Sequence, residues 1–239
     1  MKAKNLITTF FRHLAMCLCF FLIFANTTNS SAQGWIQTYG PYWGDEFGLE
    51  GFKDIVRTAD GGYIAIGTGI DIMDGNNGFV AKVDANGAKQ WEEWYNLDWN
   101  GFFKSIVVAN DGGYLIGGGL PNFGQNDTFW NTKLIKIDDT GNIEWERDFS
   151  QSNGGFMEFG TAEDIKALEN GYVLVGYSAI GDFVEPQAQA YIMKIDNNGE
   201  VIWQQTVFDY GRSKFHAVEI FENGNFLAVG EFESFDFSN

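Results

Sequence analysis

The sequence predicts an all-β protein built from a repeated unit of four antiparallel strands. Three observations lead to this prediction. Two short motifs recur along the chain, each copy carries apolar residues on both strand faces, and glycines stand among many aromatic residues. The chain of 239 residues has 30 Gly, 23 Phe, 9 Tyr, 8 Trp and only 3 Pro, a composition typical of many short strands joined by tight turns.

Residues 1–32 are typical of a secretory signal peptide. The segment begins with basic residues, continues with an unbroken apolar run at 14–25, and ends with the small residues 30–32. An uncleaved membrane anchor is the alternative, but the run is short for a bilayer span. We therefore expect a mature chain of residues 33–239 that is secreted or displayed at the cell surface, with no membrane insertion after cleavage.

Cleavage changes which chemistry the chain could support. Both cysteines, Cys17 and Cys19, leave with the signal peptide, which excludes disulfides, thiolate metal sites and a cysteine nucleophile. His216 becomes the only histidine. The segment holds three basic residues and no acidic one, so its removal takes the formal charge from −17 to −20. A surface this acidic repels nucleic acid and anionic lipid, and we expect neither as a partner.

The first repeated motif reads Lys-x-Asp-x-x-Gly-x-x-x-Trp. It occurs three times, at 82–91, 136–145 and 194–203. We interpret its Asp-x-x-Gly part as a hairpin turn, in which the carboxylate accepts backbone amides and the glycine takes a positive φ. These structural carboxylates are Asp84, Asp138 and Asp196. Calcium binding by the same aspartates is the alternative, which their repetition in every unit disfavours.

The second motif lies upstream and reads Asp/Asn-Gly followed by an aromatic residue and, four positions later, a closing glycine. Its four copies span 60–67, 111–118, 170–176 and 223–230. In the first copy we predict strand A around Ile55, strand B from Tyr63, a long variable loop, strand C over 79–84 and strand D from Trp91. The tryptophans lie 54 and then 58 residues apart, a length that fits a four-stranded unit and exceeds a leucine-rich repeat.

The B strands decide how the units are stacked. In the first copy Tyr63 and Ala65 share one face, Ile64 and Ile66 share the other, and both faces are apolar. Such a strand needs a neighbour on each side, and blades stacked around an axis supply both. We predict a β-propeller of four-stranded antiparallel blades, with about three and a half blades present. They cover 41–95, 96–149, 150–207 and, in part, 208–239.

The two ends of the repeat region are incomplete in complementary ways. Residues 35–39 match a lone strand D, and the fourth copy stops after strand B. A missing strand C would expose an apolar edge, so we expect a truncated chain whose blades pack against missing ones. The alternative is a four-bladed ring whose last blade is completed by 35–39.

At these residues the chain resembles secreted bacterial β-propeller repeat proteins. Their repeats read roughly T-x-D-G-G-Y-x-x-x-G, then K-x-D-x-x-G-x-x-x-W, and residues 58–63 and 82–91 match this pattern. The resemblance covers nearly all of the mature chain. It implies a propeller, often followed by a C-terminal sorting domain, and no such domain is recognisable here.

A looser likeness joins the chain to quinoprotein and WD40-like propellers. Quinoprotein blades use an Asp-x-x-x-Gly-x-x-x-Trp motif to dock one blade on the next, whereas the Asp-to-Gly spacing here is one residue shorter. The likeness implies a structural role for Trp91, Trp145 and Trp203. It does not imply a quinone, and we expect no cofactor except possible calcium.

Candidate ligand sites lie in the segments between strands. Asp71 and Asp74 belong to an oxygen-rich stretch that could bind calcium, although it lacks the EF-hand order and a solvated acidic loop is the alternative. Other variable segments pair aromatic rings with carboxylates, an arrangement that could stack on sugar rings; local packing is the alternative. These binding candidates are Trp99, Phe123, Asp127, Trp130, Asp182 and Phe183.

Two functional hypotheses follow. The first is a secreted, non-catalytic binding or scaffold module that contacts an extracellular glycan or protein through its loops. The second is a polysaccharide-active, endoglucanase-like hydrolase, which needs two facing carboxylates; Asp127, Asp182 and Glu185 are the loop acids to inspect. A Ser-His-Asp site is not supported, because His216 lies in a predicted apolar strand and no Gly-x-Ser-x-Gly occurs.

Overall fold

The computed structural model describes residues 51–71, 75–97, 101–123, 128–149, 158–180, 187–207 and 211–234, all within one compact unit, 37–239. The predicted signal peptide, 1–32, and the lone strand, 35–39, lie outside the described residues. In the part of the chain that is described, every regular element is a β-strand and every strand pair is antiparallel. The all-β prediction is therefore confirmed.

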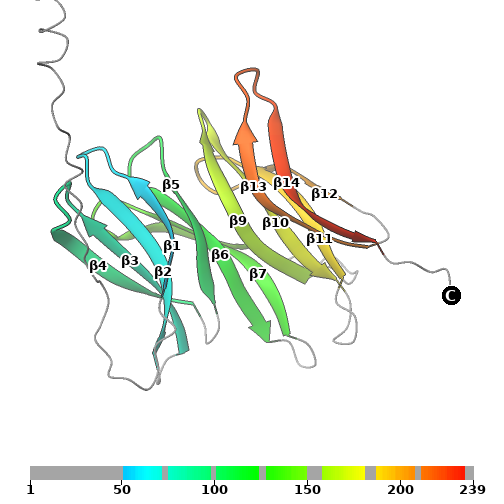
Figure 1. The fold of residues 1–239 in the computed structure, drawn as a ribbon, viewed down its shortest axis with the longest axis horizontal. Helices are drawn as coiled ribbons and strands as arrows, with labels where there is room; N and C mark the ends of the chain where they lie inside the picture. The colour runs from blue at the N-terminus through cyan, green and yellow to red at the C-terminus, as the bar shows by residue number, and fades with distance from the viewer. Residues whose placement is uncertain are drawn as a thin grey trace, which may run out of the picture. The chain divides into compact units, whose positions relative to one another are not determined.

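The strands form successive up-and-down sheets in chain order (Figure 1). Sheet I contains β1 (Gly51–Arg57), β2 (Tyr63–Asp71), β3 (Gly75–Val83) and β4 (Lys89–Asn96). Sheet II contains β5 (Phe102–Val108), β6 (Tyr114–Phe123), β7 (Thr128–Ile137) and β8 (Ile143–Phe149). Sheet III contains β9 (Glu158–Leu168), β10 (Gly171–Ile180), β11 (Gln187–Ile195) and β12 (Val201–Thr206). Sheet IV contains β13 (Gly211–Ile220) and β14 (Phe226–Ser234).

Four antiparallel strands per unit were predicted, and sheets I to III have them. The strand limits differ in two places. The third strand of sheet I begins at Gly75, because β2 and β3 stay paired as far as Asp71 and Gly75, so most of the predicted variable loop is strand. The fourth strand begins at Lys89, two residues before Trp91, because Lys89 already pairs with Val83.

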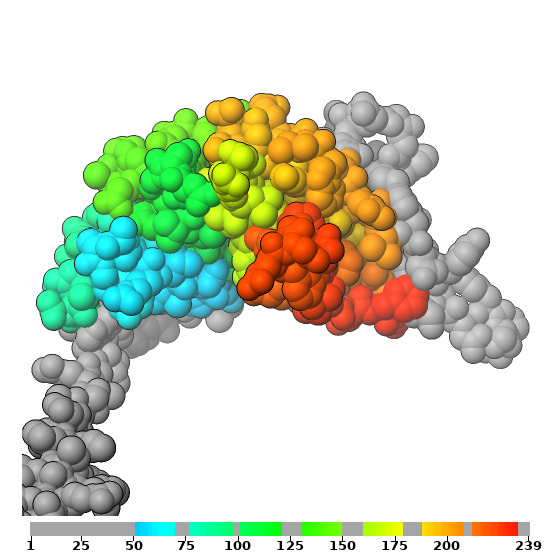
Figure 2. Space-filling view, turned by 90° about the horizontal axis from the view of Figure 1, so that it is seen from above, coloured from blue at the N-terminus to red at the C-terminus, as the bar shows by residue number. Residues whose placement is uncertain are grey.

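Each pair of neighbouring sheets encloses an apolar core. Ile64 and Ile66 of sheet I pack with Ile106, Tyr114 and Ile116 of sheet II. A second core, which includes Leu115 and Leu174, lies between sheets II and III. A third, which includes Val173 and Val218, lies between sheets III and IV. In Figure 2 the residues of sheet IV (orange-red) lie against those of sheet III. In sheets II and III, which have a packed sheet on each side, both faces of the second strand are buried, as the apolar pattern predicted, whereas Tyr63 and Ala65 of sheet I are half-buried.

The closing glycine of the second motif permits an irregularity shared by all four sheets. The first strand of each sheet carries a register shift, at Lys53, Lys104, Glu163 and His216. At this point the two strands approach closely: a Cβ at Gly118 would lie 1.9 Å from the Phe102 carbonyl oxygen, and one at Gly176 would lie 1.8 Å from that of Thr161. A side chain at this position would therefore push the bulged strand away.

The bulged strands also tie neighbouring sheets together. Asp54 accepts the amide of Ile106 through Oδ2 at 2.9 Å, and Asp164 likewise accepts the amide of Val218 at 2.9 Å. Between them, Ser105 Oγ accepts the amide of Ile165 at 3.2 Å. Each side chain thus satisfies a backbone donor of the next sheet, which would otherwise be left without a partner at a strand edge.

Candidate functional site

The motif tryptophans join one sheet to the turn of the next. The Trp91 indole N–H donates to the carbonyl of Asp139 at 3.1 Å, and that of Trp145 donates to the carbonyl of Asn197 at 3.2 Å. Both acceptors lie in the next Asp-x-x-Gly turn. The indole of Trp145 also lies so close to Gly199 that an added Cβ would be 2.9 Å from the ring. The glycine therefore serves both the turn and the docked indole.

Trp203 occupies the same motif position, but within the part of the chain that the structure describes no such turn contacts it. Its side chain packs on Phe226 of β14 with ring centroids 6.0 Å apart, and 37% of the residue is exposed. Within the described ranges its indole N–H makes no hydrogen bond. The third tryptophan therefore differs from the other two in its surroundings and not in its sequence motif.

The motif aspartates organise their own turns. Oδ1 of Asp84 accepts the amides of Asn86 and Ala88 at 2.8 and 2.9 Å, and Asp138 and Asp196 repeat this pattern. The glycine that ends each turn has a φ of 80° to 90°. Among the described residues, no group of three or more His, Cys, Asp or Glu is placed to hold a metal. The hydrogen bonds assign these three carboxylates to the turn.

Hydrogen bonds to exposed carboxylates lower their pKa values. Side-chain bonds from Asn142 and Thr140 hold the pKa of Asp138 well below its usual value, and the backbone amide of Glu200 lowers that of Asp196. Asp60, in the turn before β2, accepts from Thr58, Gln90 and the Gly62 amide, and its pKa falls to about 2. The folded state therefore binds these protons more weakly than the unfolded chain does.

We expect stability to fall as the pH is lowered from about 4 to about 2. A depressed folded-state pKa contributes stability that is complete above the unfolded value of 3.8 and is lost as the pH falls through the folded value. Asp138→Asn keeps an acceptor oxygen but removes the proton equilibrium. Thermal unfolding of 33–239 at pH 7 and pH 2.5 should show a smaller difference for the variant than for the wild type. An unchanged difference would contradict this assignment.

Two motif lysines are buried ion-pair partners. Lys82 is 3% exposed and bonds Asp139 of sheet II, and Lys136 is 1% exposed and bonds Glu144, Asp111 and the carbonyl of Gly112. An exposed pairing of Lys82 with Asp84 on one strand face is the simpler reading of the sequence. The structure instead directs Lys82 to the neighbouring sheet, where its ammonium has acceptors.

The predicted ligand-binding residues fall mostly beyond what the structure describes. Trp99, Asp127, Asp182, Phe183, Glu185 and Asp74 lie outside the described residues. Phe123 and Trp130 lie in paired strands, β6 and β7, rather than in a loop. Asp71 is the last residue of β2 and pairs with Gly75.

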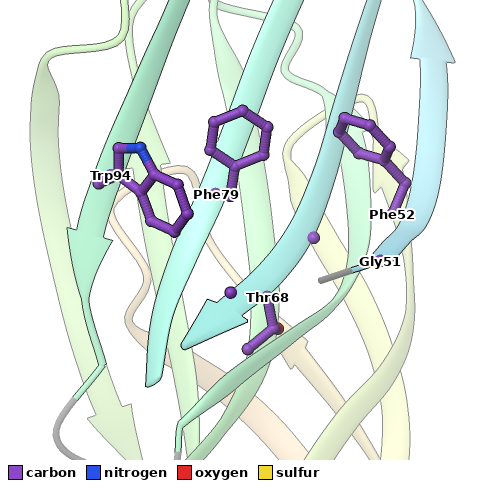
Figure 3. Close-up of a pocket in the computed structure, with 7 residues that line it drawn as sticks. Gly51, Phe52, Thr68, Phe79 and Trp94 are labelled. Atoms are coloured by element: carbon purple, nitrogen blue, oxygen red, sulfur yellow. The ribbon is translucent and has the colours of Figure 1, made fainter. Parts of the chain in front are cut away.

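A different set of aromatic residues forms a row across sheet I (Figure 3). The backbone register places Phe52, Gly67, Phe79 and Trp94 opposite one another on β1, β2, β3 and β4. The Phe79 ring centroid lies 4.7 Å from that of Trp94 and 5.8 Å from that of Phe52. Gly67 contributes no side chain, so a pocket of about 70 Å³ opens within the row.

The row combines exposed rings with an uncharged lining. Phe52 and Trp94 are 45% and 38% exposed, while Phe79 is almost buried. The remaining lining consists of Gly51, Gly67, Thr68 and Gly69, so no ionisable side chain contributes. The sequence-based strand order did not predict this row. Comparing the residues at the same cross-strand position in each repeat would have found it, because among sheets I to III only sheet I has two aromatic residues there.

Comparison with known proteins leaves the chain without an assigned family. No family model matches the sequence, and no curated protein matches it. No described helix is long and apolar enough to cross a membrane.

Proposed function

We propose that this chain is a secreted, non-catalytic binding module of the β-propeller type that holds a glycan on the aromatic row of sheet I. The observation that carries the proposal is the row itself, in which Phe52, Phe79 and Trp94 surround an uncharged pocket. Aromatic faces offer a flat apolar surface to the C–H groups of a sugar ring. The Thr68 hydroxyl accepts the amide of Phe103 at 3.1 Å and so links the pocket wall to β5.

The repeat pattern supports a ligand role for the row. The cross-strand pair Phe79–Trp94 of sheet I corresponds to Lys133–Asp148 in sheet II and to Tyr191–Thr206 in sheet III. In sheet II this pair is ionic, with Lys133 Nζ 2.8 Å from Asp148. Packing of one sheet on the next does not require two aromatic rings there, so the aromatic pair is a special feature of sheet I.

Pocket size and lining favour binding over hydrolysis. About 70 Å³ is far below the roughly 300–1,000 Å³ of sites that enclose a small molecule, so a sugar would lie on the row. Glycoside hydrolysis needs two carboxyl groups about 5–10 Å apart. Neither this pocket nor the hollow beside Trp203 has an Asp or Glu in its lining.

A glycan array probed with residues 33–239 tests the proposal. We expect binding to one or more glycans, and we expect Trp94→Ala to weaken it by about tenfold or more through loss of the stacking face. Phe232→Ala is the matched control, since it removes an exposed aromatic side chain from sheet IV. Absence of binding to every glycan would refute the glycan proposal, and so would equal binding by Trp94→Ala. Release of reducing ends from a bound polysaccharide would favour the hydrolase.

A further inference from the structure

Among the described residues, sheet IV lacks contacts that the internal sheets II and III have. Leu227 and Val229 of β14 are 48% and 51% exposed. The corresponding residues of β10, Val173 and Val175, are completely buried against sheet IV, and Leu115 of β6 is completely buried against sheet III. The repeat therefore places apolar side chains on β14 at positions that elsewhere face a packed neighbour.

The backbone of β14 is also incomplete on one side. In sheets I to III the second strand pairs with a first and a third strand, as β10 does with β9 and β11. β14 pairs with β13, and no strand pairs with its other edge among the described residues. This edge offers a row of amides and carbonyls to an incoming strand.

Beside that edge lies a hollow of about 680 Å³. Trp203 and Phe226 line it together with Asn223 and Gly224 of the β13–β14 turn. By correspondence with Trp91 and Trp145, this hollow is where a following Asp-x-x-Gly turn would contact the indole of Trp203. The lining of this hollow contains no charged side chain.

The turn between β13 and β14 can also receive a lysine. In sheet II, Lys136 of the third strand donates to the carbonyl of Gly112 at 2.7 Å and pairs with Asp111. These two residues correspond to Gly224 and Asn223, which line the hollow. A strand with lysine opposite Leu227 would place its ammonium at this turn, in the same register as Lys136 opposite Leu115.

We propose that the edge of β14 and the hollow at Trp203 together bind a β-hairpin of a partner polypeptide that carries the Lys-x-Asp-x-x-Gly motif. Its first strand pairs antiparallel with β14, its lysine reaches Asn223 and Gly224, and its turn covers the indole of Trp203. This site is separate from the aromatic row of sheet I and does not depend on glycan binding.

Two details of the chain define the partner further. Among the described residues, a second copy of this chain offers no unpaired hairpin with this motif, because β3, β7 and β11 are each paired with the second strand of their own sheet. In addition, Asn225 stands where the other sheets have glycine, and an added Cβ at Gly113 would lie 2.0 Å from a carbonyl of the third strand. The same carbonyl belongs to Ile137, which pairs with Tyr114, the counterpart of Phe226, so the incoming strand pairs from Leu227 onward.

A synthetic peptide with the sequence of residues 187–207 serves as the probe hairpin. We expect saturable binding of one peptide to residues 33–239 in biolayer interferometry. Trp203→Ala in the protein, with the peptide left unchanged, should weaken binding at least tenfold. A peptide that carries both Lys194→Ala and Gly199→Val should bind the unchanged protein at least tenfold more weakly. Trp94→Ala, on sheet I, is the control and should bind the peptide normally.

A fusion removes the cost of ordering a free peptide, since an isolated hairpin is only marginally stable. The same sequence joined after Asn239 through a flexible linker should raise the unfolding temperature by about 3 °C or more. Trp203→Ala at the original position, and not in the appended copy, should abolish this rise. If neither peptide nor fusion has an effect, or if Trp203→Ala changes neither, the proposal is wrong. Self-association that the peptide does not displace would assign the surface to a second copy and overturn the partner named here.

Discussion

Trp145→Ala is expected to lower the free energy of unfolding by about 3 kcal/mol, near the lower end for replacing a packed tryptophan. Its indole is packed against the core between sheets II and III, donates to the Asn197 carbonyl and lies against Gly199. The guanidinium of Arg147 lies 5.5 Å from the ring centroid. Removing the ring would leave a cavity at the junction and an unpaired carbonyl. Urea unfolding of residues 33–239 followed by circular dichroism measures the change.

Trp203→Ala is the matched control, because it removes the same residue from the same motif position. No turn among the described residues covers its indole, and Phe226 is the ring that it packs on, so the substitution should cost about 1 kcal/mol. Trp145→Phe should lose about 1 kcal/mol for the hydrogen bond and retain most of the packing. Equal losses at Trp145 and Trp203 would show that the docked turn contributes nothing to stability.

Gly176→Ala is expected to destabilise the chain by about 3 kcal/mol or more, or to prevent folding. The new Cβ would lie 1.8 Å from the Thr161 carbonyl oxygen, which is main chain and cannot rotate away. To relieve this clash, β9 would have to move away from β10. The Thr161 carbonyl is also held by Tyr191, whose Oη donates to it at 3.1 Å and is hydrogen-bonded to Thr132 Oγ1 of sheet II. Forced overpacking of this kind typically costs 1–3 kcal/mol or more. Soluble yield and thermal unfolding temperature report the effect.

Gly51→Ala is the control for that substitution. Nothing lies within 4 Å of a Cβ built at Gly51, so this variant should remain within about 0.5 kcal/mol of the wild type. If Gly176→Ala were tolerated equally well, the closing glycine would have to be explained by something other than the approach of the bulged strand.

Local sequence was sufficient to predict the strands and turns. Tyr63 and Tyr114 were predicted to open second strands, and β2 and β6 begin there. These features depend on residues close in the chain: glycine permits a positive φ, an aspartate carboxylate accepts amides two and four residues ahead, and apolar residues on both faces require two covered sides. The strand ends were less predictable, because Gly75 and Lys89 become strand through pairing with a neighbour.

The candidate sites depended on contacts that no local pattern contains. Phe52, Phe79 and Trp94 form a row because three hairpin registers align them across sheet I, whereas the ligand residues predicted from the sequence were expected in the intervening segments. Lys82 and Asp84 share one strand face and could pair, yet the acceptor of Lys82 is Asp139 of the next sheet.

The sequence by itself determined the all-β class, the four-strand unit and the Asp-x-x-Gly turns, since each follows from short-range stereochemistry repeated along the chain. Only the tertiary structure decided that Trp91 and Trp145 are docked while Trp203 is partly exposed, and that the valines of β10 are buried while Val229 of β14 is not. The motif is the same in each case. The difference arises because burial and hydrogen bonding of a side chain depend on which sheet lies beside it, and a repeat specifies its own strands without specifying its neighbour.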